Sequence, residues 1–298
     1  MSQFLAFTDY LSLEKNYSTH TVKAYLTDLQ TFSEYCLQNY DSSVLLDCNY
    51  SQIRSWIVSM VEAGISHRTI NRKISSLKSY YKFLLKTGQI DVSPLVKHKA
   101  LKVSKKVQVP FSVQEMKKVL EWLEFEDSFE GVRDKLMIEL LYATGMRKAE
   151  LIELKLSSID LQNNTIKILG KRNKERMVPL LPSVVKNVVL YLERRKKVCY
   201  DANQGYLFLT NKGAKVYDSL VYRIINLYFS KASSKLKKSP HVLRHTFATH
   251  LLNEGADLNA VKELLGHTSL AATQVYVHNS MSRLKEVYKN SHPRNSKT

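Results

Sequence analysis

Apolar residues recur at helical spacing through the first third of the chain, and this pattern predicts four short helices. Three of them are predicted over residues 3–15, 19–39 and 51–63, and the fourth extends from the N-cap candidate Ser66 to a stop at Gly88. The clearest apolar stripe, in the second helix, consists of Val22, Tyr25, Leu26, Leu29, Phe32 and Cys36. Amphipathic helices of this kind bury their apolar stripes against one another, so a small helical domain is expected over residues 1–92.

The fourth predicted helix is basic: it carries six Lys or Arg residues and no acidic residue. At 100° per residue, five of these side chains share about one third of the helix circumference, opposite the apolar stripe. They are Arg68, Arg72, Lys78, Lys82 and Lys86. A face of this kind suits contact with a phosphate backbone, although a solvated lysine face is an alternative that composition leaves open.

A basic linker is predicted over residues 93–110, with five lysines and no acidic residue. Such a segment is expected to be extended and to lie across a nucleic-acid backbone, and an ordinary flexible linker is equally consistent with its composition. The linker separates the first domain from a second one over residues 111–298.

The second domain mixes helical and strand patterns. Ser112 and Glu115 form a capping-box pattern, and a helix over residues 132–143 is expected to stop at Gly145. Alternating apolar residues predict strands at 165–169 and 176–180, joined by a turn at 170–174, and a third short strand at 206–209; further helices are predicted at 183–197 and 217–229. The fold class expected is mainly α with two domains, the second being α+β with a small antiparallel sheet.

Charge narrows the class of partner. The 298 residues carry a formal net charge of +18, with pI about 9.6, and 44% of them are hydrophobic. A field this positive favours a polyanionic partner, nucleic acid above all, and no run of 18 apolar residues suggests a membrane span. Cys36, Cys48 and Cys199 are far apart in the sequence, which favours neither a disulfide framework nor a thiolate metal site. A soluble cytoplasmic protein is therefore expected.

Candidate chemistry gathers near the C-terminus. Ser239 and Pro240 signal a helix start, so His241 and Arg244 share one helix face. Gly266-His267 closes a second short helix, and Tyr276 follows nine residues after this histidine. An arginine fork matches phosphate oxygens, and a tyrosine hydroxyl becomes a nucleophile when a neighbouring base or cation helps to remove its proton. These residue types predict a site for a phosphodiester.

Three further residues are candidates for this site, although position alone favours a surface role for Arg147. The alternative of a zinc site is weak. Arg147 lies just after the stop at Gly145, and Glu150 three residues on is able to orient it. Lys171 at the hairpin turn is a mobile proton donor. His241 and His245 have zinc-ligand spacing, but Val242 occupies the position of the glutamate in the HExxH motif, so no metal site is expected.

The motifs HVLRH and LLGHTSLAATQVYVH, together with ATGMRKAEL and GKRNKERMVPL, resemble the signatures of the tyrosine recombinases, in the order typical of that family. The ending SHPR at 291–294 is similar to that of the Xer-type members. The resemblance implies a four-helix, SAM-like core-binding domain followed by a catalytic domain. It also implies that a helix at about 281–290 is exchanged between subunits.

The resemblance implies a role for each matching residue. Tyr276 is the nucleophile that forms a 3′-phosphotyrosyl bond, His241 is the acid/base, and Lys171 protonates the leaving 5′-oxygen. Arg147, Arg244 and His267 contact the scissile phosphate, with Glu150 in support. Arg172, Lys174 and Arg176 are expected to bind the DNA backbone. No metal and no other cofactor is expected, because the phosphotyrosyl bond retains the energy of the phosphodiester.

The expected activity is site-specific recombination of duplex DNA, in the Xer-type role of resolving chromosome dimers during chromosome partition and cell division. The alternatives are an integrase or transposase of a mobile element, a type IB topoisomerase-like enzyme, and a non-catalytic DNA-binding protein. The expected partners are a DNA recombination site, a homo- or hetero-tetramer on two such sites, a paralogous recombinase and a septal DNA translocase. No membrane partner is expected.

Overall fold

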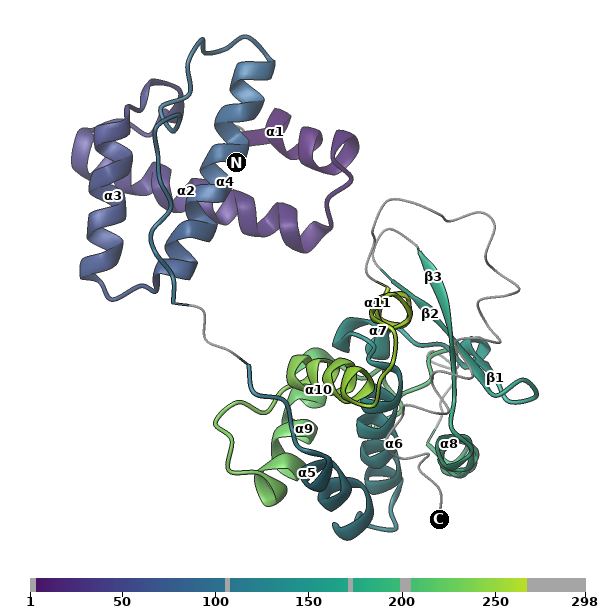
Figure 1. The fold of residues 1–298 in the computed structure, drawn as a ribbon. Coiled ribbons are helices and arrows are strands. Elements are labelled where there is room, and N and C mark those ends of the chain that lie inside the picture. Colours follow the sequence, from purple (N-terminus) through teal and green to yellow (C-terminus); the bar gives the residue numbers. More distant parts are fainter. Residues whose placement is uncertain (1–3, 105–107, 171–173, 199–204, 267–298) are drawn as a thin grey trace. The chain divides into compact units, whose positions relative to one another are not determined.

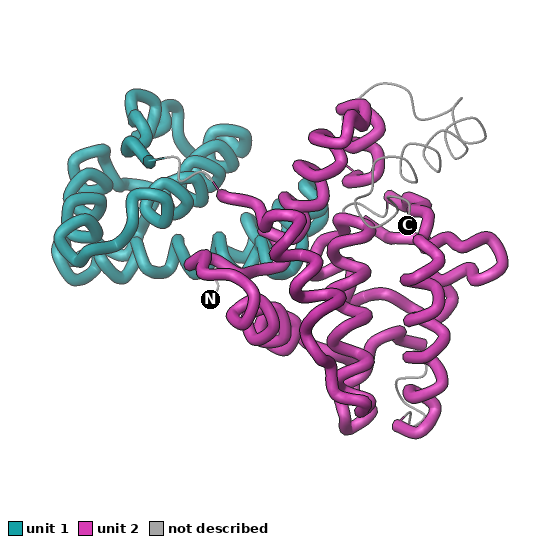
Figure 2. Tube along the Cα trace, turned by 60° about the horizontal axis from the view of Figure 1, so that its bottom comes forward, with its two compact units in different colours: residues 1–106 teal, residues 107–298 magenta. Residues whose placement is uncertain are grey.

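The computed structural model describes residues 4–104, 108–170, 174–198 and 205–266. The chain divides into two compact units, Met1–Lys106 and Val107–Thr298 (Figure 2). Each unit has its own hydrophobic core. No helix within the described ranges is long and apolar enough to cross a membrane.

The first unit consists of the four predicted helices (Figure 1). In chain order its elements are α1 (Leu5–Asp9), the π-helical turn η2 (Tyr10–Glu14), α2 (Thr19–Tyr40), the 3-10 turn η3 (Leu45–Asp47), α3 (Tyr50–Glu62) and α4 (His67–Lys86). The first predicted helix is thus an α-helical turn that continues into a π-helical one. The other three agree with the sequence pattern to within about two residues at each end.

Helix α4 organises this unit, and its limits follow from local chemistry. The Ser66 hydroxyl accepts a hydrogen bond from the amide of Thr69, which caps the first turn. Gly88 takes the left-handed conformation (φ 67°) just beyond the last turn, which favours glycine. Between these limits Ile70, Leu77 and other apolar residues are buried against α2 and α3. The basic side chains remain on the opposite, solvent-facing side, as the periodicity predicts.

Most of the predicted linker belongs to the first unit. The Asn71 side chain both donates to the Leu101 carbonyl (2.8 Å) and accepts from the Leu101 amide (2.9 Å). Nδ1 of His67 lies 2.8 Å from the Lys102 carbonyl, and the side chain of Leu95 is buried in the helical core. The boundary between the units accordingly lies at residues 106/107, whereas the sequence placed the end of the domain at residue 92.

The second unit combines helices with a small sheet (Figure 1). Its helices are α5 (Val113–Lys117) with the π-helical turn η4 (Lys118–Trp122), α6 (Phe129–Thr144), α7 (Lys148–Ile152), the 3-10 turn η5 (Leu156–Ser158), α8 (Pro182–Arg195), α9 (Asp218–Ala232), α10 (Pro240–Asn253) and α11 (Leu258–Leu265). Its strands are β1 (Ile159–Asp160), β2 (Thr165–Leu169) and β3 (Glu175–Pro179).

Helix α6 is the centre of this unit. Every residue from Leu136 to Thr144 is buried, and the helix packs against α8, α9 and α10. Gly145 ends α6 in the left-handed conformation (φ 59°), and a side chain there would collide with Phe247 and Leu265. The tight approach of α10 and α11 to the end of α6 therefore requires glycine at this position.

The sheet is antiparallel with the order β1-β2-β3, and its β2–β3 hairpin is the one predicted. The third strand differs from the prediction. Residues 206–209 contribute only isolated bridges, Lys155 with Tyr206 and Leu209 with Lys215, while the third strand is the two-residue β1. A strand this short carries too little sequence pattern to be predicted.

Candidate active site

Two arginines bind one carboxylate in the second unit, and a third arginine lies close enough for their charges to act on it. Arg147 precedes α7, Glu150 lies in α7, Arg176 lies in β3 and Arg244 lies in α10. These elements are up to about a hundred residues apart in the sequence, and the fold brings them together beside the end of α6. The cluster they form will be called the arginine cluster.

Glu150 is the centre of the arginine cluster. Its Oε2 accepts a hydrogen bond from the backbone amide of Arg147 (2.8 Å), and its Oε1 accepts one from Nη1 of Arg147 (2.7 Å). The guanidinium of Arg176 donates to both carboxylate oxygens, at 3.2 and 2.7 Å. Burial alone would raise the pKa of Glu150, but the hydrogen bonds from Arg176 and Arg147 outweigh it and hold this pKa below its usual value. The carboxylate is therefore ionised at neutral pH, and it binds Arg147, the residue that the sequence expects it to orient.

Arg244 is held by backbone carbonyls. Its Nη1 donates to the carbonyl of Gly145 and its Nη2 to that of Leu265, each at 2.7 Å. Burial, with the positive charges of Arg147 and Arg176, lowers the pKa of Arg244 to about 10, so the side chain keeps its charge at neutral pH. The ends of α6 and α11 thus fix one arginine, and Glu150 fixes the other.

His241 lies one helical turn before Arg244 on α10, and its side chain is exposed. Pro240 is at the first helical position as predicted, but the Ser239 hydroxyl makes no cap hydrogen bond and is buried without a partner in the part of the chain that the structure describes. The helix thus begins where the sequence indicated, without the predicted side-chain cap. The exposed imidazole is free to meet a substrate that approaches from solvent.

The other two histidines of α10 differ from each other. His245 is exposed. His250 is buried, with Nδ1 2.9 Å from the Tyr142 hydroxyl and Nε2 2.9 Å from the Phe111 carbonyl. Desolvation lowers the pKa of His250, so a neutral imidazole links α10 to α6 and to the start of the unit. Over the described residues, no group of three or more His, Cys, Asp or Glu side chains is arranged to hold a metal ion.

Arg176 does not occupy the position expected for a DNA-backbone contact. Only 10% of its side chain is exposed, and each of its three side-chain nitrogens hydrogen-bonds within the protein. The sequence contained a signal for this: Arg176 pairs with Ile168 in the hairpin and lies two residues before Val178, and both of these are buried. Since residues two apart in a strand share a face, Arg176 points inward. Lys174, in contrast, is exposed at the hairpin turn.

The basic face of α4 is only partly available. Arg72 forms a bidentate ion pair with Asp28 of α2, and Lys86 pairs with Glu14. The Lys78 ammonium lies 3.5 Å from the His98 carbonyl in the docked linker. Arg68 and Lys82 are exposed and make no ion pair with a described residue. These two are the strongest candidates on α4 for phosphate contacts.

Four of the predicted site residues lie outside the described residues: Lys171, Arg172, His267 and Tyr276. The same holds for the exchange helix predicted at about 281–290. Gly170 and Gly266, which precede Lys171 and His267, are described, and both lie against Arg176. The two segments therefore leave the described fold at the arginine cluster.

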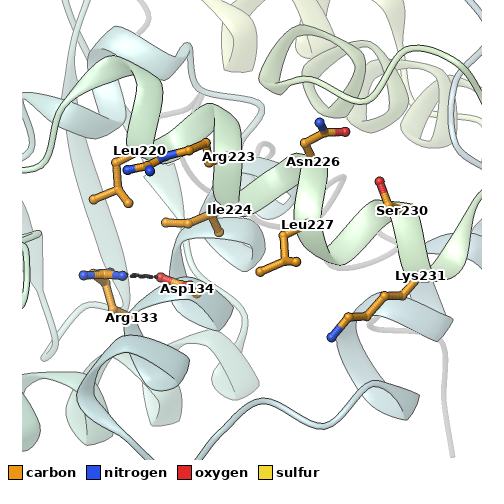
Figure 3. A pocket seen from close by; sticks show the side chains of 9 residues that line it. All are labelled: Arg133, Asp134, Leu220, Arg223, Ile224, Asn226, Leu227, Ser230 and Lys231. Atoms are coloured by element: carbon orange, nitrogen blue, oxygen red, sulfur yellow. Dashed lines mark hydrogen bonds and ion pairs between the residues drawn. The ribbon is translucent and has the colours of Figure 1, made fainter.

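A surface groove elsewhere in this unit is not part of the site. It lies between the start of α6 and the outer face of α9, and its lining includes Arg133, Asp134, Leu220, Arg223 and Leu227 (Figure 3). Arg133 and Asp134 form an ion pair with each other there. The lining contains none of the predicted catalytic residues.

The arrangement suits a large anionic substrate. The side chain of Arg147 is 36% exposed and His241 is exposed, so the cluster is open to solvent. Two guanidinium groups bind one carboxylate and the charge of a third, Arg244, acts on them, so the described side chains of the cluster carry more positive than negative charge. A phosphate held there would contact arginines whose orientation is set before binding, which is the requirement for electrostatic stabilisation of a transition state.

Comparison with known proteins agrees with this geometry. The model of the phage integrase family matches residues 112–283, and that of the phage integrase N-terminal SAM-like domain matches residues 4–88. The tyrosine recombinase XerC of Oceanobacillus iheyensis is 39% identical over 291 residues, covering 97% of this chain and 95% of that protein. The tyrosine recombinase XerC of Bacillus subtilis strain 168 is 36% identical over 299 residues, with the same coverage.

Solved structures show the same architecture. The XerH site-specific recombinase bound to a palindromic difH substrate, in a post-cleavage complex, matches with a TM-score of 0.71 and 25% identity, covering 92% of this chain and 81% of that one. The Tn1549 transposon integrase in complex with transposon right-end DNA also matches with a TM-score of 0.71, at 22% identity, which supports the fold.

The chain belongs to the phage integrase family, the tyrosine recombinases. The two-domain, mainly helical fold class and the predicted class of enzyme, one that cleaves and transfers DNA strands, are thereby confirmed.

Proposed function

We propose that the protein is a Xer-type site-specific recombinase whose active site is the arginine cluster together with His241, Lys171, His267 and Tyr276. The observation that carries the proposal is the pair Arg147 and Arg244. Glu150 binds the first and two helix-end carbonyls bind the second, so the orientation of both guanidinium groups is set and both keep their charge. Such a pair supplies two preorganised forks for the non-bridging oxygens of one phosphate.

The proposed reaction has two transfers. The Tyr276 oxygen attacks the scissile phosphorus while its proton passes to His241, and the bond from phosphorus to the 5′-oxygen breaks. Lys171 gives a proton to that oxygen, which leaves a 3′-phosphotyrosyl bond and a free 5′-hydroxyl. Arg147 and Arg244 stabilise the charge that builds on the phosphate, and His267 donates a hydrogen bond to it. A 5′-hydroxyl of a second strand then reverses the reaction, so no ATP or metal takes part.

The proposed biological role is the resolution of chromosome dimers during chromosome partition and cell division, in the cytoplasm. The XerC relatives match along almost the whole chain, and this similarity supports the role over that of a mobile-element integrase. The proposed assembly is a tetramer on two DNA sites, with subunits linked through residues 281–290. A paralogous recombinase and a septal DNA translocase are the proposed protein partners.

Covalent trapping tests the proposal. The protein is incubated with fragmented DNA from its source genome, the reaction is stopped with detergent, and the DNA that stays attached is sequenced. Tyr276→Phe should abolish the adducts, while Tyr222→Phe, which alters a tyrosine that is 46% exposed on α9, should not. Adducts at one chromosomal locus support the Xer-type role, and adducts at the ends of mobile elements would assign an integrase instead. No adduct, even with paralogous subunits supplied, would overturn the catalytic proposal.

A further inference from the structure

The hydrogen bonds that Arg176 makes within the arginine cluster leave little of its side chain available for contact with a phosphate. Its Nε donates to the Leu264 carbonyl at the end of α11 (2.9 Å), and its two terminal nitrogens donate to the two oxygens of Glu150. One guanidinium of β3 thus binds α7 and α11 at once. Its side chain is 10% exposed, so little of it remains for DNA.

Through these contacts Arg176 is linked indirectly to Arg147 and to Arg244, the two arginines proposed to bind the phosphate. Glu150, which Arg176 grips, is the group that holds the side chain and the amide of Arg147. Leu264, whose carbonyl Arg176 binds, adjoins Leu265, whose carbonyl binds Arg244. A shift of the Arg176 guanidinium would therefore be passed to both forks.

Two glycines pack against the same guanidinium. A Cβ atom on Gly266 would lie 3.3 Å from Cδ and Nη1 of Arg176, and one on Gly170 would lie 3.5 Å from its Nη1. These glycines immediately precede His267 and Lys171 in the sequence. Arg176 therefore lies beside the two described residues that directly precede Lys171 and His267 in the sequence.

We propose that Arg176 is a positioning residue for strand cleavage and touches no substrate itself. This role rests on the proposed function. It holds Glu150, and through it Arg147, in register with the end of α11 and the hairpin of β2 and β3. The role depends on three nitrogens that point in fixed directions, and a lysine has only one. Charge alone cannot replace it.

The test compares Arg176→Lys and Arg176→Gln with the matched control Lys174→Gln, which alters an exposed cation on the same hairpin. Single-turnover adduct formation on the DNA site found by trapping should slow by about 100-fold in both Arg176 variants, because a misplacement of about 1 Å costs that much. DNA affinity and its salt dependence should stay as in the wild type. Lys174→Gln should instead reduce the salt slope by about one, whereas Lys167→Gln, which alters an exposed cation of β2 that pairs with Glu175, should leave both the salt slope and cleavage unchanged.

The outcomes separate positioning from other roles. A reduced salt slope in Arg176→Gln would assign a phosphate contact, and wild-type cleavage by Arg176→Lys would show that charge suffices; either result overturns the proposal. Circular dichroism and thermal unfolding establish that each variant is folded. The lysine variant keeps the charge and therefore serves as the milder change if the glutamine variant does not fold.

Two further readouts do not follow from a general loss of structure. Glu150 faces Arg147, Arg176 and Arg244, and removal of Arg176 takes away a group that lowers its pKa. Cleavage by Arg176→Gln should therefore fall more steeply than that of the wild type as the pH is lowered from about 7 to about 5. NMR of arginine Nε groups should show shifted Arg147 and Arg244 signals in Arg176→Lys and unchanged ones in Lys174→Gln.

The NMR readout also distinguishes the two proposals. If the wild type forms no adduct with any DNA, the proposed function fails, whereas the Nε signals still report whether Arg176 positions the other arginines. If the wild type cleaves and these signals do not move, the proposed function stands and the positioning role is wrong.

Discussion

Among the described residues, each unit holds a buried carboxylate that binds two cationic side chains, and these two carboxylates serve different purposes. In the first unit Asp28, which is 1% exposed, accepts hydrogen bonds from both terminal nitrogens of Arg72 (2.5 and 2.9 Å) and from the Ser76 hydroxyl (2.7 Å), with Lys73 at 3.4 Å. All of these partners belong to α4, so the contacts join α2 to α4. The Asp28 group is thus a cross-link within a helical core.

Glu150 in the second unit has partners from two elements, the start of α7 and strand β3. One partner, Arg147, keeps 36% of its side chain exposed, and Arg244 adds a third positive charge nearby. The comparison shows how the same chemistry stabilises a fold or prepares a site. Arg72 and Arg147 both keep part of their side chains exposed, so the difference lies in the setting: the partners of Asp28 all belong to α4, whereas Glu150 joins α7 to β3 near Arg244.

The largest expected effect comes from Arg244, the arginine that the carbonyls of Gly145 and Leu265 bind. Arg244→Gln should slow single-turnover cleavage by about 100- to 1000-fold, because it removes one fork from the charge that develops on the phosphate. The control Arg223→Gln alters an exposed arginine of α9 and should leave cleavage unchanged. Cleavage within threefold of the wild type would contradict the role of Arg244.

Replacing each of the two carboxylates, Glu150 and Asp28, by an amide tests the comparison between them directly. Glu150→Gln should lower the free energy of unfolding by about 3 kcal/mol, because it leaves the nearly buried Arg176 without its counter-charge. Asp28→Asn should cost less, about 1 to 2 kcal/mol, because the Arg72 side chain is 50% exposed and can turn to water. Urea unfolding of both variants measures the difference.

Activity should separate the same two variants. Cleavage of bound DNA should fall at least about tenfold in Glu150→Gln, since Arg147 loses the charge that orients it, and should stay near the wild-type rate in Asp28→Asn. Equal losses of activity at equal stability would remove the distinction between an orienting carboxylate and a structural one.

The sequence predicted both domains because helical periodicity and end signals agree: Ser66 and Gly88 bound α4, and the capping box at Ser112 and Glu115 has both of its hydrogen bonds. It also put Glu150 within reach of Arg147, and the two side chains form an ion pair. It did not predict the contacts that depend on long-range packing, such as the docked linker at Asn71.

The pair Cys36 and Cys48 shows the same limit. The sequence suggested neither a disulfide framework nor a metal site for the cysteines, and it did not predict that these two free thiols meet, with their sulfur atoms 3.6 Å apart in the first core. The C-terminal end of α2 and the turn before α3 bring them together, and no local pattern reports such a meeting. Burial, with the neighbouring Cys48, raises the pKa of Cys36 to about 12, as expected of a structural, unreactive thiol.

Arg68 and Arg72 lie one turn apart on α4, and they allow an exposed arginine to be compared with a carboxylate-bound one in DNA binding. Arg68 is exposed without an ion pair among the described residues, whereas Arg72 is held by Asp28. Arg68→Gln should weaken DNA binding a few-fold and reduce the salt slope by about one, with unchanged stability. Arg72→Gln should mainly lower the free energy of unfolding. Fluorescence anisotropy across salt concentrations distinguishes these outcomes, and an equal salt slope in both variants would contradict the assignment.

The smallest expected effect on stability comes from a third carboxylate bound to a cation, Glu115 with Lys235. Burial would raise the pKa of Glu115, but hydrogen bonds from Lys235, Ser233 and the Ser112 amide lower it to about 2. Because this folded-state pKa lies below the unfolded value of about 4.5, the stabilisation is complete above pH 4.5 and is lost as the pH falls towards 2. The wild type should thus exceed Glu115→Gln by about 1 kcal/mol in free energy of unfolding at pH 7. Urea unfolding between pH 7 and pH 2 should show this difference shrinking only below pH 4.5, and a constant difference would show that the carboxylate charge contributes nothing.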